Sequence, residues 1–352
     1  MNPTLVQKVP ATSTVARTAR SDDEFGAASV LLRIRGSVRE GTRDGAYDLT
    51  FQALGTRCRV SFSAPAGLAR ELSGQVLAWV ATFEAKYSRF LPASLISRIN
   101  AAAGREPVAI DADTERLFAL CDQMHFITRG TLDPTALPLL QAWDWKASPP
   151  VLPDPASIEA ARQLCGWRKL QRGAGTVFLP KAGMGLDLGG MGKEFAVDQV
   201  AELLAAGGAT GVLVDFGADV RVIGRPADGR PGWHIGLDDP VQPGRCWCGL
   251  GLVEGAVATS GDYIRRFEIN GRRYGHILDV RTGQPVDNGC RAVSVLGPNC
   301  TFAGMLSTAV FVLGPEEGLG LIETQYGFEG AVLTDRGIFT TRKFHGYVAS
   351  KA

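Results

Sequence analysis

The sequence lacks any apolar run close to the ~18 residues that a membrane-spanning helix needs. Its first residues, Met1 to Glu24, are mixed polar and contain no apolar segment of the kind that a secretory signal peptide carries. We therefore expect no transmembrane segment and a cytoplasmic location. A periplasmic location is the expectation if the start codon is misassigned and the true start lies upstream.

The sequence also lacks an excess of charge of either sign, with 37 Lys and Arg against 36 Asp and Glu. A formal charge of +1 provides no general attraction to nucleic acid or to an anionic membrane, so neither is expected as a partner. Any anionic ligand must then be held by a local arrangement of donors and cations.

Cysteine occurs seven times, an odd number, and never as a Cys-x-x-Cys pair. Such scattered cysteines do not predict a disulfide framework, and a reducing compartment is expected. Cys246 and Cys248 are two residues apart and would share one face of a strand. Metal binding there is the alternative to the ordinary interpretation, in which both are small apolar positions.

Glycine is abundant, with 43 residues where an average usage of about 7% gives roughly 25. Many glycines predict tight turns and places where backbone can approach a ligand. The 352 residues, 45% of them hydrophobic, suit a large core. Residues 1–45 lack periodicity and are rich in Ser, Thr, Arg and Asp, which predicts a mobile tail. Residues 46–350 are expected to form one domain.

Apolar residues recur at helical spacing in several segments. Helices are predicted over residues 68–87, 114–128, 193–206 and 303–313, with a further one starting at Asp154-Pro155. Asp113 is the expected N-cap of the second helix and Gly130 its expected stop. An aspartate before a proline is the start signal of the helix at 154.

Strands are predicted at residues 47–51, 177–179, 185–188, 212–216 and 233–237. Asn270-Gly271 stands between two further strand-like runs, 267–269 and 273–280, and is the strongest hairpin signal in the chain. Helices mixed with antiparallel strands predict an α+β fold rather than a uniform series of βαβ units.

The segment Asp187-Leu-Gly-Gly-Met-Gly-Lys193 places a glycine turn at a helix N-terminus, with a lysine in the first turn. Free backbone N–H groups and the positive end of the helix dipole suit a diphosphate there. The segment fits neither the Walker pattern nor the dinucleotide fingerprint. A purely structural strand-to-helix turn is the alternative interpretation.

A second polar segment, Tyr274 to Gly283, sets His276, Asp279 and Arg281 close together at the end of the predicted hairpin. A histidine can accept a proton from a hydroxyl near neutral pH, which group transfer to a side chain requires. In the alternative interpretation, Asp279 and Arg281 pair in a turn and His276 only packs. A third segment, Gly130 to Thr135, indicates a turn or helix start around Asp-Pro-Thr.

Taken in order, these segments closely resemble the ApbE family of FAD:protein FMN transferases. The matching segments are Leu54–Thr56, Ser88–Asn100, Gly130–Thr135, Trp143, Asp187–Lys193, Phe195–Asp198, Val257–Tyr263, His276–Asp279, Arg281–Gly283 and Leu306–Thr308. They span about residues 47 to 345, essentially the whole predicted domain. The resemblance implies a mixed fold of antiparallel sheet and packed helices, with an FAD cleft between its subregions.

The resemblance also implies a reaction: the FMN moiety of FAD moves to a Thr or Ser side chain of an acceptor flavoprotein, and AMP is released. The implied FAD contacts are Leu54, Phe90, Thr131, Leu132, Asp133, Asp187, Lys193 and Leu278. Phe90 replaces another aromatic residue and could stack on a ring. His276 is the implied base. The implied magnesium ligands are the carbonyl of Gly190 and the side chains of Ser307 and Thr308.

The chain departs from the family pattern at this metal. Gly304 stands where the family usually has an aspartate, so the implied protein ligands are neutral although magnesium favours carboxylate and phosphate oxygens. Either FAD itself holds the metal, or another acid such as Asp215 or Asp279 substitutes, or metal-dependent chemistry is lost. Lesser departures are Leu54 for Met, Gly217-Ala218 for a Gly-Gly pair, and Glu194 for the Gly after the lysine.

The missing aspartate keeps a non-catalytic function open, in which the protein is an FAD-binding accessory protein or carrier. A third possibility is hydrolysis of FAD to FMN and AMP, with water in place of the acceptor hydroxyl.

Overall fold

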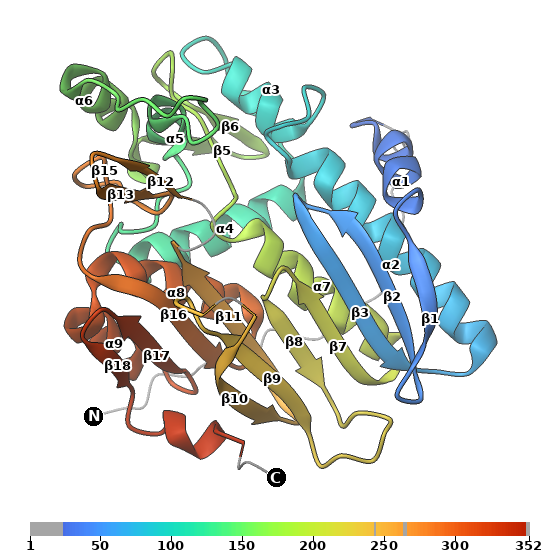
Figure 1. The fold of residues 1–352 in the computed structure, drawn as a ribbon. Helices are drawn as coiled ribbons and strands as arrows, with labels where there is room; N and C mark the ends of the chain where they lie inside the picture. The colour runs from blue at the N-terminus through green and yellow to red at the C-terminus, as the bar shows by residue number, and fades with distance from the viewer. Residues whose placement is uncertain (1–23, 243, 263–265, 350–352) are drawn as a thin grey trace, which may run out of the picture.

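The computed structural model describes residues 24–242, 244–262 and 266–349. Its centre is a nine-stranded sheet in the order β1-β2-β3-β7-β8-β11-β16-β17-β18, in which every neighbouring pair is antiparallel (Figure 1). The strands are β1 (Arg39–Arg43), β2 (Ala46–Ala53), β3 (Thr56–Ser63), β7 (Thr210–Phe216), β8 (Val220–Ile223), β11 (Glu254–Gly261), β16 (Cys290–Gly297), β17 (Glu329–Thr334) and β18 (Gly337–Thr340).

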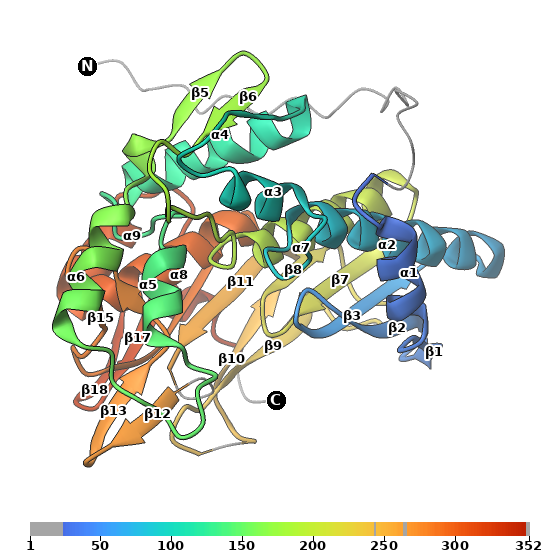
Figure 2. The ribbon, with the colours of Figure 1, turned by 90° about the horizontal axis from the view of Figure 1, so that it is seen from above.

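Four helices cover one face of this sheet, as Figure 2 shows: α2 (Ala66–Tyr87), α7 (Gly192–Ala206), α8 (Cys300–Leu313) and α9 (Pro315–Glu323). The largest core cluster fills the space between them and the sheet, with Phe51 from β2, Val200 from α7 and Val310 from α8 among its buried members. Burying this face is the main source of the fold's stability, because removal of apolar surface from water is the dominant favourable term.

Helix α8 is apolar on almost every side because it lies between two cores. Leu306 and Val310 pack toward the sheet, whereas Met305 and Ala309 belong to a second cluster on the outer side. That second cluster joins α8 to α3 (Leu95–Ala101), α4 (Ala112–Ile127) and the small sheet of β4 (Val108–Ala109), β5 (Gln171–Gly173) and β6 (Thr176–Phe178).

A third group of elements lies at one end of the sheet (Figure 1). It comprises α5 (Leu137–Trp143), α6 (Pro155–Leu164), η1 (Trp167–Lys169), and the ribbons β12 (Arg266–Ile269) with β13 (Arg272–Gly275) and β14 (Leu278–Asp279) with β15 (Gln284–Pro285). Trp143 and Leu278 meet in its core. The segments that the sequence analysis singled out therefore come from three distinct packing units.

The opposite face of the large sheet is covered by the ribbon of β9 (Trp233–Asp238) and β10 (Cys246–Leu252), and by η2 (Phe344–Tyr347). Alternate residues of β9 are buried, as a half-buried strand requires. The ladder is irregular between Cys246 and Cys248, and both cysteines are free. Among the described residues, no helix is long and apolar enough to cross a membrane.

The α+β class and its antiparallel pairing are confirmed. So are several local predictions: Asn270 and Gly271 form the β12–β13 turn with φ of +52° and +73°, and Asp154 caps α6 by accepting from the N–H groups of Ala156 and Ser157. The predicted helices at 68–87, 193–206 and 303–313 correspond to α2, α7 and α8.

The prediction that ordered structure begins near residue 46 is wrong for residues 27–43, which form α1 (Ala27–Arg35) and β1. In α1 only Val30 and Ile34 are fully buried, too few for a clear periodic signal. Every residue of β1 is exposed, so this edge strand shows no apolar alternation. Residues 1–23 of the predicted tail lie outside the described residues.

Two smaller predictions are also wrong. The N-cap of α4 is Asp111 rather than Asp113, because the Asp111 side chain accepts from the N–H of Thr114. Residues 185–188 form no strand. Their backbone is held by other groups instead: the N–H and C=O of Leu186 bind the Asn100 amide, at 2.6 and 3.0 Å.

Candidate functional site

The loop before α7 is fixed by Asp187. One oxygen of its carboxylate accepts from the N–H of Gly189 at 2.7 Å, and the other binds Arg89 Nε at 2.5 Å. The backbone then turns through Gly190 and Met191 into the helix, and the N–H groups of Met191 and Gly192 both donate to the C=O of Leu188, at 3.0 and 2.7 Å. The backbone donors left in the first turn, as far as the described residues show, are the N–H groups of Lys193 and Glu194. This end of α7 therefore offers backbone donors and the positive end of a helix dipole to an anion.

Residues 131–133 lie against this loop. The C=O of Pro134 accepts from the N–H of Asp187 at 2.8 Å, and a Cβ placed on Gly190 would lie 3.6 Å from Leu132 Cδ2. Asp133 orders its own turn, because its carboxylate accepts from the N–H of Thr135 and from the N–H of Trp167, each at 2.8 Å. Thr131 is buried in the same segment. The structure thus brings two separate predicted segments together.

Lys193, in the first turn of α7, forms a short ion pair with Asp219 at the start of β8. Asp219 is 2% exposed and also accepts weakly from the N–H of Thr259 on β11, at 3.3 Å. The lysine side chain keeps a quarter of its surface exposed. The pair holds the ammonium where β7 turns into β8, at the end of two interior strands and beside the first turn of α7.

Three hydroxyl groups meet between β11 and α8. Ser260 Oγ lies 2.8 Å from Ser307 Oγ and 2.8 Å from Thr308 Oγ1. Ser307 also donates to the C=O of Gly304 one turn earlier, at 2.9 Å. The predicted magnesium ligands Ser307 and Thr308 thus share a polar cluster with a serine that the sequence analysis gave no role.

Glu194 follows Lys193 on α7 and is 8% exposed. Its Oε1 lies 3.7 Å from Lys193 Nζ, and its Oε2 has no hydrogen-bond partner among the described residues. A buried carboxylate oxygen without a donor is costly, so such an atom calls for an explanation.

His276 lies half-buried in the bend between β13 and β14. A Cβ on the preceding residue, Gly275, would approach Asp262 Cβ to 2.8 Å. Asp262 follows Ser260 by two residues, so the residue before His276 packs against the segment that carries one member of the hydroxyl cluster. Asp262 itself is paired with Arg273 at 3.0 Å, and burial raises the pKa of its carboxyl group.

Asp279 and Arg281 pair as the alternative interpretation of this segment expected, with Oδ2 and a guanidinium nitrogen 2.8 Å apart. Leu278 is buried beside Trp143, whose Nε1 donates to the C=O of Gly283 at 2.8 Å. These contacts fix the backbone that follows His276.

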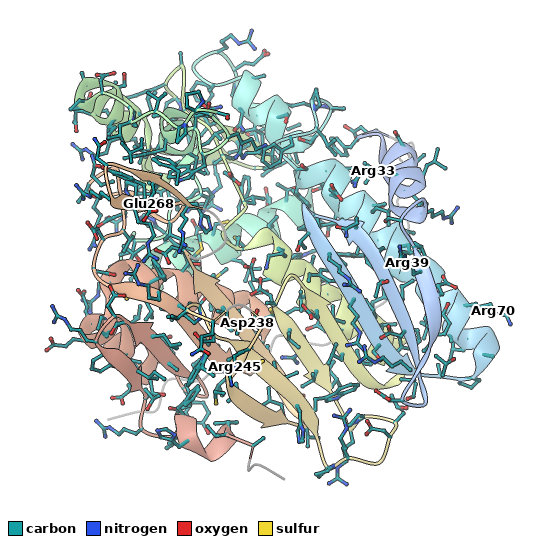
Figure 3. The ribbon with its side chains drawn as sticks, viewed as in Figure 1. Arg33, Arg39, Arg70, Asp238, Arg245 and Glu268 are labelled. Atoms are coloured by element: carbon teal, nitrogen blue, oxygen red, sulfur yellow. The ribbon has the colours of Figure 1, made fainter. Side chains whose placement is uncertain are left out.

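Leu54 and Phe90 both lie close to the C-terminal end of α2, Leu54 through Glu84 and Phe90 in the segment that follows Tyr87. Leu54 has φ +53°, and its N–H donates to Glu84 at 3.0 Å. The same carboxylate binds Arg33 of α1, which is labelled in Figure 3, at 2.7 Å. The Phe90 ring is 64% exposed, with the Arg89 guanidinium 4.1 Å from its centre. An exposed ring of this kind can stack on a planar ligand.

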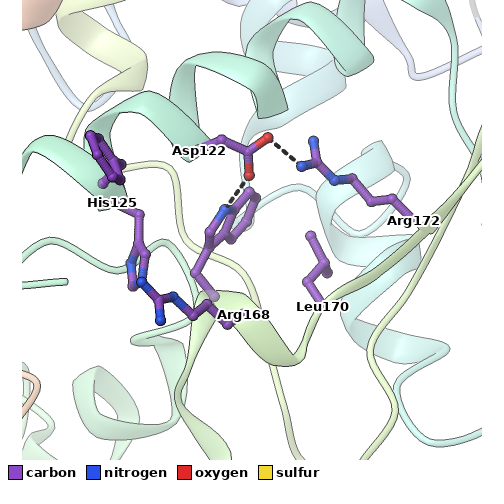
Figure 4. A pocket seen from close by; sticks show the side chains of 7 residues that line it. Asp122, His125, Arg168, Leu170 and Arg172 are labelled. Atoms are coloured by element: carbon purple, nitrogen blue, oxygen red, sulfur yellow. Dashed lines mark hydrogen bonds and ion pairs between the residues drawn. The ribbon is translucent and has the colours of Figure 1, made fainter. Parts of the chain in front are cut away.

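Two cavities open in the part of the molecule that contains α4, α6 and η1. One of about 440 Å³ includes Asp133 and Arg281 in its lining, so it borders the predicted site. The other, of about 310 Å³, lies between α4 and η1 (Figure 4). Asp122 at its edge bonds Trp167 and Arg172, and no predicted site residue lines it.

Within the described ranges, no group of three or more His, Cys, Asp or Glu side chains could hold a metal ion. Any metal at the hydroxyl cluster would therefore have at most two such side chains as ligands, together with hydroxyl, carbonyl and phosphate oxygens. The carboxylate of Asp279 forms an ion pair with Arg281. Asp215 accepts from the N–H of Ala218 at 2.9 Å, and burial raises the pKa of its carboxyl group against the opposing effects of that bond and of Lys193.

Sequence reasoning assigned no site role to Ser260, Asp219 or Glu194. Ser260 lies in a segment that matched the family, so the signal was present. Asp219 gave none, because its importance depends on a contact with Lys193 across the fold. Glu194 was noted only as a departure from the family pattern.

Comparisons with known proteins agree on one family. The model of the ApbE family matches residues 54–332. The FAD:protein FMN transferase of Treponema pallidum is 31% identical over 296 residues, covering 78% of this chain and 81% of that protein. That of Vibrio cholerae is 29% identical over 289 residues, covering 78% and 84%.

Solved structures give the same result. The ApbE protein of Thermotoga maritima superposes with a TM-score of 0.79 at 30% identity, covering 87% of this chain and all of that one. The flavin transferase ApbE of Vibrio cholerae superposes with a TM-score of 0.77 at 27% identity, covering 88% and 99%.

Proposed function

Because the chain belongs to the ApbE family, we propose that it is an FAD:protein FMN transferase, an enzyme that moves FMN from FAD to an acceptor flavoprotein. The observation that carries this proposal is the convergence at the start of α7. The backbone N–H groups of Lys193 and Glu194, the Lys193 ammonium and the Ser260–Ser307–Thr308 hydroxyl cluster belong to adjoining elements there. Such a set of donors suits a diphosphate.

The residues around this set have separate tasks. Asp187 and Asp133 order the two loops that face FAD, since their own oxygens are occupied by protein donors. Thr131 and Leu132 are buried beside these loops, Leu278 is buried in the neighbouring packing unit, and Phe90 offers an exposed ring to a flavin or adenine ring. Leu54 would close the opposite side of the cleft.

The acceptor is a threonine or serine hydroxyl of the partner flavoprotein. Its oxygen forms a new bond to the phosphorus of the FMN half, the P–O–P bond breaks, and AMP leaves with the bridging oxygen. His276 takes the proton of the hydroxyl. What supports this role is the residue before it, Gly275, which packs against Asp262, two residues after Ser260 of the hydroxyl cluster.

Magnesium fits this site in chemical type. Ser307, Thr308 and the C=O of Gly190 supply oxygen donors, and Glu194 Oε2 is a buried carboxylate oxygen without a hydrogen-bond partner among the described residues. A bound magnesium would neutralise charge on the diphosphate as the P–O–P bond breaks. Two of the candidate ligands are already held in place by Ser260.

The non-catalytic alternative, an FAD carrier, is not favoured, because the relatives described above are named as transferases. Hydrolysis of FAD by water would use the same groups, so acceptor dependence separates it from transfer.

The proposal is tested with two acceptor peptides that differ only in the flavinylated position, Thr in one and Ala in its twin. Each is incubated with the protein, FAD and magnesium, and its intact mass is measured. We expect an FMN-sized mass increase on the Thr peptide alone. No increase on either peptide, with FAD bound to the protein, would overturn the proposal.

A further inference from the structure

The side chain of Glu194 on α7 fills the space that a side chain at position 304 of α8 would take. A Cβ placed on Gly304 would overlap Glu194 Cγ and would lie 3.1 Å from Cδ and 3.3 Å from Cβ of that side chain. The glutamate side chain therefore runs across the bare backbone of α8 at Gly304. No residue larger than glycine fits at 304 while Glu194 keeps this conformation.

The Glu194 carboxylate has few hydrogen-bonding or ionic partners among the described residues. Glu194 is more than nine-tenths buried, and Oε2 has no donor among the described residues. Lys193 is its nearest cation, but that ammonium makes its close contact with Asp219 and lies 3.7 Å from Oε1. A buried anion held in this way would be stabilised by a cation at Oε2.

The surroundings of Gly304 point to the kind of cation. Ser307, one turn along α8, donates to the C=O of Gly304, and Ser260 bonds both Ser307 and Thr308. A carboxylate next to hydroxyl and carbonyl oxygens, without nitrogen or sulfur donors, is the ligand type that magnesium and manganese prefer.

We propose that Glu194 supplies the carboxylate ligand of a divalent cation at the Ser307–Thr308 cluster, in the space that Gly304 leaves open. The inference rests on the proposed function for its second ligand set, the diphosphate of FAD. The two departures from the family pattern, at 194 and 304, then compensate each other. The carboxylate ligand comes from Glu194 on α7, and glycine at 304 on α8 leaves the space that this side chain needs. Asp279, bound to Arg281, and Asp215, on β7, are not needed.

The test measures cation binding directly. Mn²⁺ is titrated into a mixture of the protein and FAD without acceptor, and the free Mn²⁺ is measured by electron paramagnetic resonance. A titration of FAD without protein gives the baseline. Glu194→Gln keeps the shape of the side chain and removes its charge, and should weaken Mn²⁺ binding at least about tenfold. Glu202→Gln removes a charge from an exposed position on the same helix and should bind Mn²⁺ like the wild type.

A double variant keeps the test independent of how well E194Q folds. Glu194→Gly alone should lose Mn²⁺ binding, and adding Gly304→Asp should restore it to within about threefold of the wild type, since the carboxylate then comes from α8. Thermal unfolding in EDTA checks the fold of each variant.

The outcomes separate this inference from the proposed function. Equal Mn²⁺ affinity in the wild type and E194Q, or no binding in the wild type, would overturn the role of Glu194 even if FMN transfer occurs. Loss in E194Q with recovery in the double variant would support it even if no FMN transfer were found.

Discussion

Asp198 of α7 holds the first turn of α8 through Thr301. Its Oδ2 accepts from the Thr301 N–H at 2.8 Å and from its hydroxyl at 2.6 Å, while Oδ1 accepts from the N–H of Cys300 at 2.8 Å. A carboxylate at a helix N-terminus satisfies free donors and complements the dipole. Asp198 therefore fixes the distance between the two helices that carry Glu194 and the hydroxyl cluster.

We predict that Asp198→Asn lowers the free energy of unfolding by about 2 kcal/mol, because charge-assisted hydrogen bonds are lost in a buried place. Thr301→Val removes only the hydroxyl contact and should cost about 1 kcal/mol. Urea denaturation of both variants checks this order. A D198N protein as stable as the wild type would show that the bond network does not hold α8.

Lys193→Met should weaken FAD binding by roughly 10- to 100-fold, since a charged donor to phosphate is removed while the apolar stem is retained. The affinity is measured by quenching of flavin fluorescence in EDTA, so that no metal contributes. Lys343→Met, at an exposed position near the C-terminus, is the matched control. Equal affinity for K193M and the control would remove Lys193 from the diphosphate site.

His276→Ala should reduce the initial rate of FMN transfer by about 10²- to 10⁴-fold, the usual contribution of a positioned general base. Its FAD affinity should stay within about twofold of the wild-type value, because the histidine acts on the acceptor hydroxyl rather than on the dinucleotide. An unchanged initial rate would show that another group takes the proton.

A pH-dependent contribution to stability is expected from Asp111, which binds Lys86 at 2.6 Å and caps α4. Burial alone would raise the pKa of Asp111, but hydrogen bonds from Lys86 and Thr114 outweigh it and lower the pKa. The pKa of Asp111 is lower in the folded protein than in the unfolded chain, where it is about 4. The stabilisation is therefore complete above about pH 4 and is lost as the pH falls through the pKa of Asp111 in the folded protein.

Asp111→Asn should therefore destabilise the protein by about 1 kcal/mol near neutral pH, and the difference from the wild type should shrink below about pH 4. Urea denaturation at several pH values measures it. Asp113, two residues further along and exposed in the first turn of α4, provides the control: Asp113→Asn should change the free energy of unfolding less at every pH. A D111N difference that stays constant into strong acid would contradict the pKa argument.

Local signals in the sequence predicted most of the fold. Asn270-Gly271 and Asp154-Pro155 act within a few residues, so a turn and a helix start could be placed from composition alone. The edge strand β1 escaped detection because an exposed strand needs no apolar alternation: its order comes from pairing with β2.

The site was only partly predictable for a related reason. The segments around Asp187 and His276 carry dense polar and glycine patterns, so they could be found by eye and by resemblance. The contact between Glu194 and Gly304 leaves no local trace, since the two residues are far apart in the chain and meet only when α7 packs on α8. From the sequence alone, Gly304 indicates the loss of a metal ligand, and Glu194 indicates only a minor departure from the family pattern.

We propose that this chain transfers FMN from bound FAD to an acceptor and is neither an FAD carrier nor an FAD hydrolase. The most direct test measures AMP and acceptor-bound FMN in the same sample, with and without the threonine peptide. We predict equal amounts of AMP and peptide-bound FMN, and little AMP without peptide. Equal AMP release in both samples with no FMN on the peptide would mean hydrolysis, and bound FAD with no AMP would mean a carrier; either result would contradict the account.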